Sequence, residues 1–357
     1  MAVYSIPLVP CLVNIPGTNF SKSKRDILIS KAWFKILEND EIKIPNEVLI
    51  GTFPDMKINF FKQPRGNIFE KFKNKSKYPH FAIYQESIHC EIVIDDKNWH
   101  TVMPEYSSHN LREKENTIRL VTETFIWLLK LRGFQYFHTP IMLKGTSIKD
   151  IWNSKNNSIE ILPLYHKPMS SPLSVYNAEF GRDYLFPEDI EWILKNHLNL
   201  YNLFYEAKNF QAVANVLKHL TTDLEMEVAM ITIWAGIEHI VKPNRETGIR
   251  QSISKRSAMI LHDRNVHPDM QLEDIYREVL AFYDYRCDVV HGNKPMMKSY
   301  VNPSKKDLKR LDGYQGSFNV FRLLMIEIIE RGCFYEKEEL VSFEEKFEEL
   351  QKKLDIQ

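Results

Sequence analysis

Two side chains in the segment FYDYRCDVVHGNKP, residues 282–295, could act together on a phosphate ester. Arg286 keeps its positive charge and offers a planar fork of N–H donors to phosphate oxygens. His291 titrates near neutral pH, so it can give or take a proton. An arginine and a histidine of this kind suit phosphoryl transfer without a metal ion. The alternative is a surface pair, which an isolated Arg and His at a helix end more often form.

The helix that carries this pair must end in a particular way for the two side chains to meet. Residues five apart on a regular helix lie about 140° apart, so Arg286 and His291 do not share one face. Gly292 is placed to let the helix loosen at His291, where the negative end of the helix dipole favours the protonated ring. Asp288 stands three residues before the histidine, within reach to orient it. We therefore expect both side chains to converge on one cleft.

Glu238 is a second candidate, because it interrupts the expected helix 223–241, which is apolar around most of its circumference. Burying an unpaired carboxylate is costly, so this residue should have a cationic partner. Arg286 and Arg256 are the two candidates for that partner. The pair would either position the catalytic arginine or form a core ion pair between two helices, and the sequence leaves both open.

Residues 1–174 mix strand and helix patterns, which predicts an α+β domain. Short runs of β-branched and aromatic residues that end at turn residues indicate strands. Apolar residues at helical spacing, followed by a glycine, indicate one helix among them. The expected strands are HFAIYQ (80–85), CEIVIDD (90–96) and IEILPLYH (159–166), and the expected helix is NTIRLVTETFIWLLKLRG (116–133).

From Pro187 onward the pattern is helical throughout, which predicts an all-α bundle over residues 187–332. Pro187 followed by two acidic residues is a typical helix start. A last segment, 336–357, reads as an acidic amphipathic helix suited to docking, to self-pairing or to packing on its own domain. Its apolar positions, spaced by three and four, are Leu340, Phe343, Phe347, Leu350 and Leu354.

Length and composition set the protein class. The 357 residues suggest two domains, and 47 basic against 47 acidic residues leave no overall charge that would point to a nucleic acid or a membrane. The four cysteines form no C-x-x-C pair and no zinc framework, which is typical of a reduced, cytoplasmic protein. No uncharged apolar run is long enough to predict a membrane span. We expect neither a metal ion nor a cofactor.

Two local basic stretches are candidate RNA contacts. Residues 293–310 hold six Lys or Arg against one Asp, directly after His291, and residues 57–77 hold seven against one Glu with phenylalanines between them. Basic residues bind phosphates and exposed aromatic rings stack on bases, although such a stretch is more often a solvated face. The candidate RNA-binding residues are Asn293, Lys294, Lys298, Lys305 and Lys306.

Four segments together resemble the Apea-like branch of the HEPN superfamily, a group of small helical bundles often found in RNA cleavage and prokaryotic defence. The match is in the order and spacing of a Trp-and-Glu helix, a Lys-Arg helix and an Arg-x4-His helix, and it covers roughly residues 187–332. The matching segments are ITIWAGIEHIV (231–241), SKRSAMIL (254–261), YDYRCDVVHG (283–292) and LKRLDGYQGSFNVFRLLMIEII (308–329).

The resemblance implies a metal-independent endoribonuclease that acts in antiphage or stress defence. His291 would deprotonate the ribose 2′-hydroxyl or protonate the leaving 5′-oxygen, and Arg286 would stabilise charge on the phosphate. A homodimer would pair two such motifs in one composite site, and the N-terminal domain would sense a trigger or restrain the site. Cys287 departs from the polar residue that often follows the arginine. The alternative is therefore a non-catalytic RNA-binding or dimerisation module, or an adaptor in a defence complex.

Overall fold

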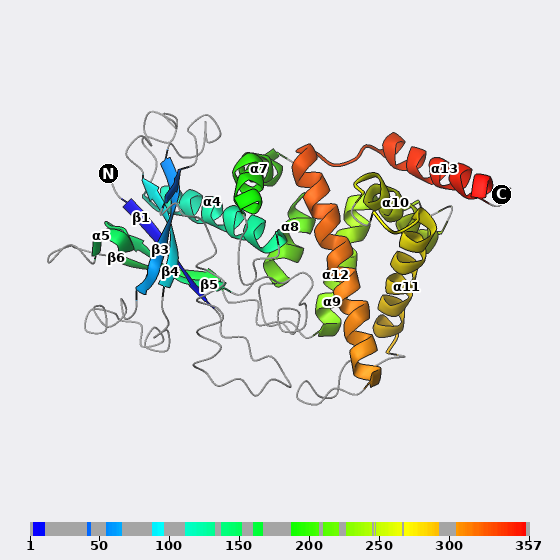
Figure 1. The fold of residues 1–357 in the computed structure, drawn as a ribbon, viewed down its shortest axis with the longest axis horizontal. Helices are drawn as coiled ribbons and strands as arrows, with labels where there is room; N and C mark the ends of the chain where they lie inside the picture. Colours follow the sequence, from blue (N-terminus) through cyan, green and yellow to red (C-terminus); the bar gives the residue numbers. More distant parts are fainter. Residues whose placement is uncertain are drawn as a thin grey trace. The chain divides into compact units, whose positions relative to one another are not determined.

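The computed structural model of the chain describes fourteen stretches, and Figure 1 shows the fold. Met1–Ser170 and Ser174–Tyr201 form one compact unit, and Ser171–Leu173 and Asn202–Gln357 form the second. The described residues are 3–10, 41–43, 55–65, 88–95, 111–132, 137–151, 160–166, 187–206, 210–220, 226–244, 246, 248–265, 268–292 and 305–354.

The described part of the first unit contains a six-stranded antiparallel sheet in the order β2-β3-β4-β1-β5-β6. Its strands are β1 (Val3–Pro10), β2 (Glu41–Lys43), β3 (Asp55–Arg65), β4 (Ile88–Asp95), β5 (Phe137–Lys144) and β6 (Glu160–His166). The strands expected at 90–96 and 159–166 are confirmed as β4 and β6, and the one expected at 80–85 lies outside the described residues. In β4 four consecutive side chains, 91–94, are buried, as in a strand covered on both faces.

Helices α4 (Leu111–Leu131) and α5 (Ile148–Ile151) also belong to the first unit, and α4 confirms the expected helix. Helix α7 (Pro187–Glu206) begins at Pro187, as expected. Its start packs against α4, because buried Asp189 accepts a hydrogen bond from Arg132 Nε at 2.8 Å. The first unit thus contains α7 up to Tyr201, whereas the sequence had grouped all of this helix with the bundle.

The described part of the second unit is helical, as expected. Its helices are α8 (Phe210–Leu220), α9 (Met226–Val241), α10 (Ile249–Asp263), α11 (Leu272–Val290), α12 (Lys305–Arg331) and α13 (Lys337–Leu354). Helix α9 is the central one, since it packs against α8, α11 and α12 and carries the fully buried Trp234. Figure 1 shows α9, α11 and α12 lying side by side.

Glycines let α12 approach its neighbours closely. A Cβ placed on Gly316 would lie 2.2 Å from the Phe282 ring of α11, and one on Gly313 would lie 2.7 Å from the ring of Tyr285. These distances are shorter than ordinary van der Waals contacts, so a Cβ at either position would force the neighbouring ring to shift. The aromatic face of α11 is therefore seated directly on the α12 backbone, which fixes the end of α11 that carries Arg286.

Helix α13 packs on its own unit. Leu340 and Phe347 are completely buried, and the Phe347 ring lies 4.8 Å from the ring of Tyr276 on α11. Phe343 packs edge-on against Tyr335, with ring centroids 5.3 Å apart. Leu350 is 37% exposed. Of the three roles open for this helix, the structure describes packing on its own domain.

Among the helices described, none is both long enough and apolar enough to span a membrane.

Candidate functional site

Helix α11 ends at His291 and Gly292 as the sequence predicts, whereas the convergence of the Arg286 and His291 side chains on one cleft stays a prediction. His291 follows the last helical residue with φ −83° and ψ 3°, and its backbone N–H still donates to Cys287 O at 3.0 Å. Gly292 takes the left-handed φ of 69°, and its N–H donates to Val289 O at 3.0 Å. A glycine at this position ends a helix without a Cβ clash. The exposed His291 side chain therefore sits at the C-terminal cap, where the helix dipole is negative.

Arg286 is the partner of Glu238. Its Nη2 lies 3.4 Å from Glu238 Oε1 on α9, and the two side chains are 22% and 31% exposed. On another side, the Arg286 Cζ lies 5.5 Å from the centroid of the Tyr283 ring, within the range of a cation–π contact. The guanidinium is thus held by a carboxylate and an aromatic ring while part of it stays open to solvent.

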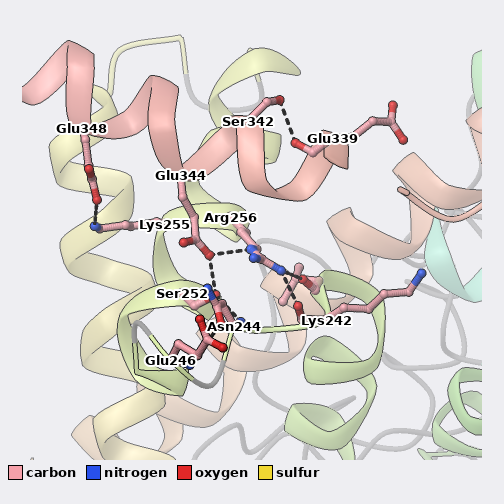
Figure 2. Close-up of polar contacts among 11 residues, drawn as sticks. Lys242, Asn244, Glu246, Ser252, Lys255, Arg256, Glu339, Ser342, Glu344 and Glu348 are labelled. Carbon is pink, nitrogen blue, oxygen red and sulfur yellow. Dashed lines mark hydrogen bonds and ion pairs between the residues drawn. The ribbon is translucent and has the colours of Figure 1, made fainter. Parts of the chain in front are cut away.

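Arg256, the other partner considered for Glu238, donates its hydrogen bonds to Glu344 and to two backbone carbonyls. Figure 2 shows its guanidinium between α13 and the end of α9. The Nε donates to Glu344 Oε1 at 2.6 Å, and Nη1 donates to Val241 O at 2.9 Å and to Lys242 O. The residue is 2% exposed. These contacts join α10 to α13 and to the end of α9, and the supporting role expected of Arg256 at the Arg286–His291 pair stays a prediction.

Glu344 completes this buried network. Its Oε1 also accepts a hydrogen bond from Ser252 Oγ at 2.5 Å, as Figure 2 shows. One turn further along α13, Glu348 Oε1 accepts from Lys255 Nζ at 2.8 Å, but the Glu348 side chain is 53% exposed. The polar side of α13 thus binds α10 through one buried pair and one exposed pair.

The remaining predicted residues are only partly described. Asp288 lies half-buried in the last turn of α11, three residues before His291, and its role in orienting that ring stays a prediction. Lys305 and Lys306 begin α12, but their side chains lie outside the described residues, as do Asn293, Lys294 and Lys298 entirely. RNA contact through these five residues also stays a prediction. The first residues of the basic stretch 57–77 form part of β3.

A buried carboxylate in the first unit escaped the sequence analysis. Glu91 in β4 is completely buried and accepts hydrogen bonds from Ser5 Oγ, from Asn59 Nδ2 at 2.8 Å, and from the backbone N–H groups of Ile148 at 2.7 Å and Lys149 at 3.1 Å. Burial raises its pKa, and the hydrogen bonds act in the opposite direction. The acid ties β4 to β1, β3 and the start of α5. Its position as the charged residue between apolar neighbours in CEIVI was the signal that could have found it.

The contact between Tyr283 and Trp234 also escaped the sequence analysis. Tyr283 is 7% exposed, and burial raises the pKa of its hydroxyl. Its ring meets the Trp234 ring edge-on, with centroids 5.2 Å apart. The sequence contains both aromatic residues within the segments analysed, but spacing alone does not show that they touch.

In the stretches that the structure describes, no three His, Cys, Asp or Glu side chains gather as a metal-binding group. Comparison of the chain with protein-family profiles, curated proteins and solved structures finds no match. The family resemblance seen in the motif residues therefore stays a prediction.

Proposed function

We propose that the helical unit is a metal-independent endoribonuclease of the HEPN type, with Arg286 and His291 as its catalytic residues. The supporting observation is the arrangement at the end of α11. Arg286 is held by Glu238 and Tyr283 but stays partly exposed, and the exposed His291 caps the same helix. A fixed cation and a titratable ring at one helix end suit a phosphodiester substrate.

In the proposed reaction, the ribose 2′-oxygen attacks the adjacent phosphorus and the bond from phosphorus to the 5′-oxygen breaks. The 2′-hydroxyl loses its proton and the leaving 5′-oxygen gains one, so the products are a 2′,3′-cyclic phosphate and a 5′-hydroxyl. His291 takes part in one of these proton transfers. Arg286 donates N–H groups to the non-bridging oxygens, whose charge grows in the transition state.

The contact between Arg286 and Glu238 suits this role because it is loose. A nearby pair, Arg250 and Asp284, is bidentate, with Nε–Oδ1 and Nη2–Oδ2 distances of 2.6 and 2.5 Å. Glu238 instead meets Arg286 through Oε1, which lies 3.4 Å from Nη2. A single long contact holds the guanidinium without filling its donor fork, so a phosphate can compete for it.

The proposal includes a homodimer with one composite site. Exposed apolar side chains on α9 and α11 support the homodimer. Val228 and Ile231 on α9 are 44% and 41% exposed, and Val290 on α11, beside His291, is 41% exposed. Small-angle scattering on the full chain should give a dimer, and Ile231→Glu should weaken both association and cleavage. A chain that cleaves RNA as a monomer contradicts the composite site.

The direct experiment measures RNA cleavage by catalytic variants and matched controls. His291→Ala should lower the rate by about 10²–10⁴-fold, the usual loss for proton transfer. Arg286→Lys should also fail, because lysine lacks the planar fork. The controls are His262→Ala, at the end of α10, and Arg277→Lys, on the exposed face of α11, and both should cleave like the parent.

Cleavage should persist in EDTA, and RNA with a 2′-deoxy sugar at the cut position should resist. The proposal is refuted if the double variant, His291→Ala with Arg286→Lys, cleaves RNA at the parent rate while both control variants do the same.

A second candidate function follows from Cys287, which stands directly after Arg286 and is half-buried. A half-buried thiol is a poor substitute for a polar residue at the site, which favours a non-catalytic module that binds RNA or dimerises as an adaptor. In that case the parent binds RNA without cutting it. Cys287→Asn should then produce cleavage, whereas it should leave an active parent broadly unchanged.

The first unit is proposed to sense the trigger or restrain the site, in a protein that acts in antiphage or stress defence. The support is that the chain divides into two compact units, of which only the second carries the Arg-x4-His motif. A trigger should then change the cleavage rate of the full chain. Equal rates with and without phage infection of the expressing cells would contradict this role.

A further inference from the structure

The inner side of the Arg286 guanidinium is held without a hydrogen bond. Its Nε is buried and makes no hydrogen bond in the described part of the chain, although the side chain as a whole is 22% exposed. What the structure places beside the guanidinium is the Tyr283 ring, 5.5 Å from Cζ to the centroid. The face of an aromatic ring attracts a cation, and more strongly away from water. The ring therefore supplies the attraction that a hydrogen bond would otherwise give.

Tyr283 is itself fixed by the core of the bundle. Its ring meets Trp234 at an angle of 88°, and Trp234 Nε1 donates to Ser317 Oγ at 3.0 Å. Ser317 in turn donates to Gly313 O on α12 at 2.8 Å. Trp234 and Ser317 are completely buried. The ring beneath Arg286 is thus connected through two buried side chains to the backbone of α12, so it cannot move without disturbing the core.

We propose that Tyr283 is the positioning residue of Arg286, whose ring holds the guanidinium in place so that its exposed part is presented to an RNA phosphate. This inference rests on the proposed function, and it adds a residue that the Arg-x4-His pattern does not contain. Glu238 holds the guanidinium from α9 and Tyr283 holds it from α11. With only one of these contacts, the long arginine side chain would keep more rotamers and lose more entropy on binding phosphate.

The substitution that separates the ring from the hydroxyl is the main test. Tyr283→Leu removes the ring and keeps an apolar side chain, and Tyr283→Phe keeps the ring and removes the hydroxyl. Tyr276→Leu is the matched control on α11, because the Tyr276 ring packs on Phe347. Circular dichroism and melting curves check that each variant folds.

In full-length protein, Tyr283→Leu should lower kcat/KM for RNA cleavage by about 3- to 30-fold, the range expected for a lost cation–π contact. The loss should fall on kcat more than on KM, because Arg286 acts on transition-state charge. Tyr283→Phe and Tyr276→Leu should stay near the parent value. Parent-like cleavage by Tyr283→Leu overturns the inference, and so does an equal loss in Tyr283→Phe.

A second measurement does not depend on cleavage. In ¹⁵N-arginine-labelled protein, the Arg286 Nε–H signal is identified by its disappearance in Arg286→Lys. Ring current and burial should displace this signal from those of exposed arginines and slow its exchange with water. Tyr283→Leu should move it back, and Tyr283→Phe should not. An Arg286 signal in the parent that already behaves like an exposed arginine overturns the inference, even if Tyr283→Leu does not fold.

The two measurements keep the failure of this inference apart from that of the proposed function. A parent that cuts no RNA but shows the displaced, protected Arg286 signal removes the catalytic proposal and supports the contact with Tyr283. A parent that cuts RNA through Arg286 and His291, but whose cleavage and Arg286 signal do not change when the Tyr283 ring is removed, supports the catalytic proposal and removes the positioning role of Tyr283.

Discussion

Replacing Glu344 by alanine should loosen α13, because it leaves a buried guanidinium without the carboxylate that neutralises it. Arg256 is 2% exposed and donates to Glu344 Oε1 at 2.6 Å. Ser252 Oγ, also buried, loses its acceptor at the same time. Neither donor can turn to bulk water without opening the contact between α10 and α13.

The size of the effect follows from burial. Removing one partner of a buried ion pair costs about 3–5 kcal/mol. Arg256 keeps its two carbonyl acceptors at the end of α9, which places this case near the lower end, and the orphaned Ser252 hydroxyl adds about 1 kcal/mol. We therefore expect Glu344→Ala to cost about 3–4 kcal/mol. Glu348→Ala breaks a pair whose carboxylate is 53% exposed, so it should cost about 0–1 kcal/mol.

Native-state hydrogen exchange of the α10 and α13 amides measures this difference locally, which matters in a chain of two units. A loss of about 1.4 kcal/mol in the free energy of local opening speeds amide exchange tenfold. Glu344→Ala should therefore speed exchange in α13 by about 100- to 1,000-fold, and Glu348→Ala by less than about fivefold. The double variant Arg256→Met with Glu344→Leu should restore much of the protection, because apolar residues of similar volume can replace a buried pair.

The reasoning is refuted if Glu344→Ala and Glu348→Ala change the exchange of α13 equally. It is also refuted if removing Arg256 together with Glu344 costs as much as removing Glu344 alone, since the cost would not then come from an uncompensated charge.

Three further predictions concern the core. Burial raises the pKa of Glu91 above its ordinary 4.5, so the native state binds this proton more tightly than the unfolded state does. The protonated side chain therefore contributes its full stability below pH 4.5, and this contribution is lost as the pH rises through the native pKa. Urea unfolding between pH 4.5 and 7 should show this fall in stability in the parent but not in Glu91→Gln. Glu91→Gln should also lose about 1–3 kcal/mol of stability, because its amide N–H faces a backbone N–H. An identical dependence of stability on pH in both proteins would contradict the prediction. Gly316→Ala should cost about 1–3 kcal/mol by overpacking, and adding Phe282→Leu should recover part of it in the same assay, whereas strictly additive losses would count against a clash between these two residues. Ser317→Ala should cost about 1–3 kcal/mol in thermal unfolding by leaving the buried Trp234 N–H without an acceptor, and an unchanged melting temperature would show that this bond contributes nothing.

The features that sequence predicts well here are those decided within one turn of the chain. The end of α11 follows from Gly292, which adopts the left-handed conformation that other residues resist. The start of α7 follows from Pro187 and its acidic neighbours. The partner of Glu238 was narrowed to two arginines by the cost of an unpaired carboxylate, and the structure selects Arg286.

The features that sequence misses depend on partners far along the chain. Arg256 and Glu344 are 88 residues apart, and Glu91 meets donors 86, 32 and 57 residues away. No periodicity relates such positions, because the contact arises from how separate helices and strands pack. The same limit applies to Tyr283 and Trp234, which lie on different helices and become neighbours only when α9 packs against α11.

The packing of α11 predicts that the proposed catalytic pair at its end can be varied without loss of the fold. Phe282 and Tyr285 are seated on glycines of α12, and these rings anchor the helix. Arg286 is partly exposed and His291 is exposed, so replacing either removes little buried surface. Tyr283 is both a core residue and a neighbour of the proposed site, because its ring packs on the buried Trp234 and also lies beneath the Arg286 guanidinium. Substitutions at Tyr283 are therefore the ones for which stability and cleavage must be measured separately, and Tyr283→Phe, which keeps the ring, is the variant in which both should survive.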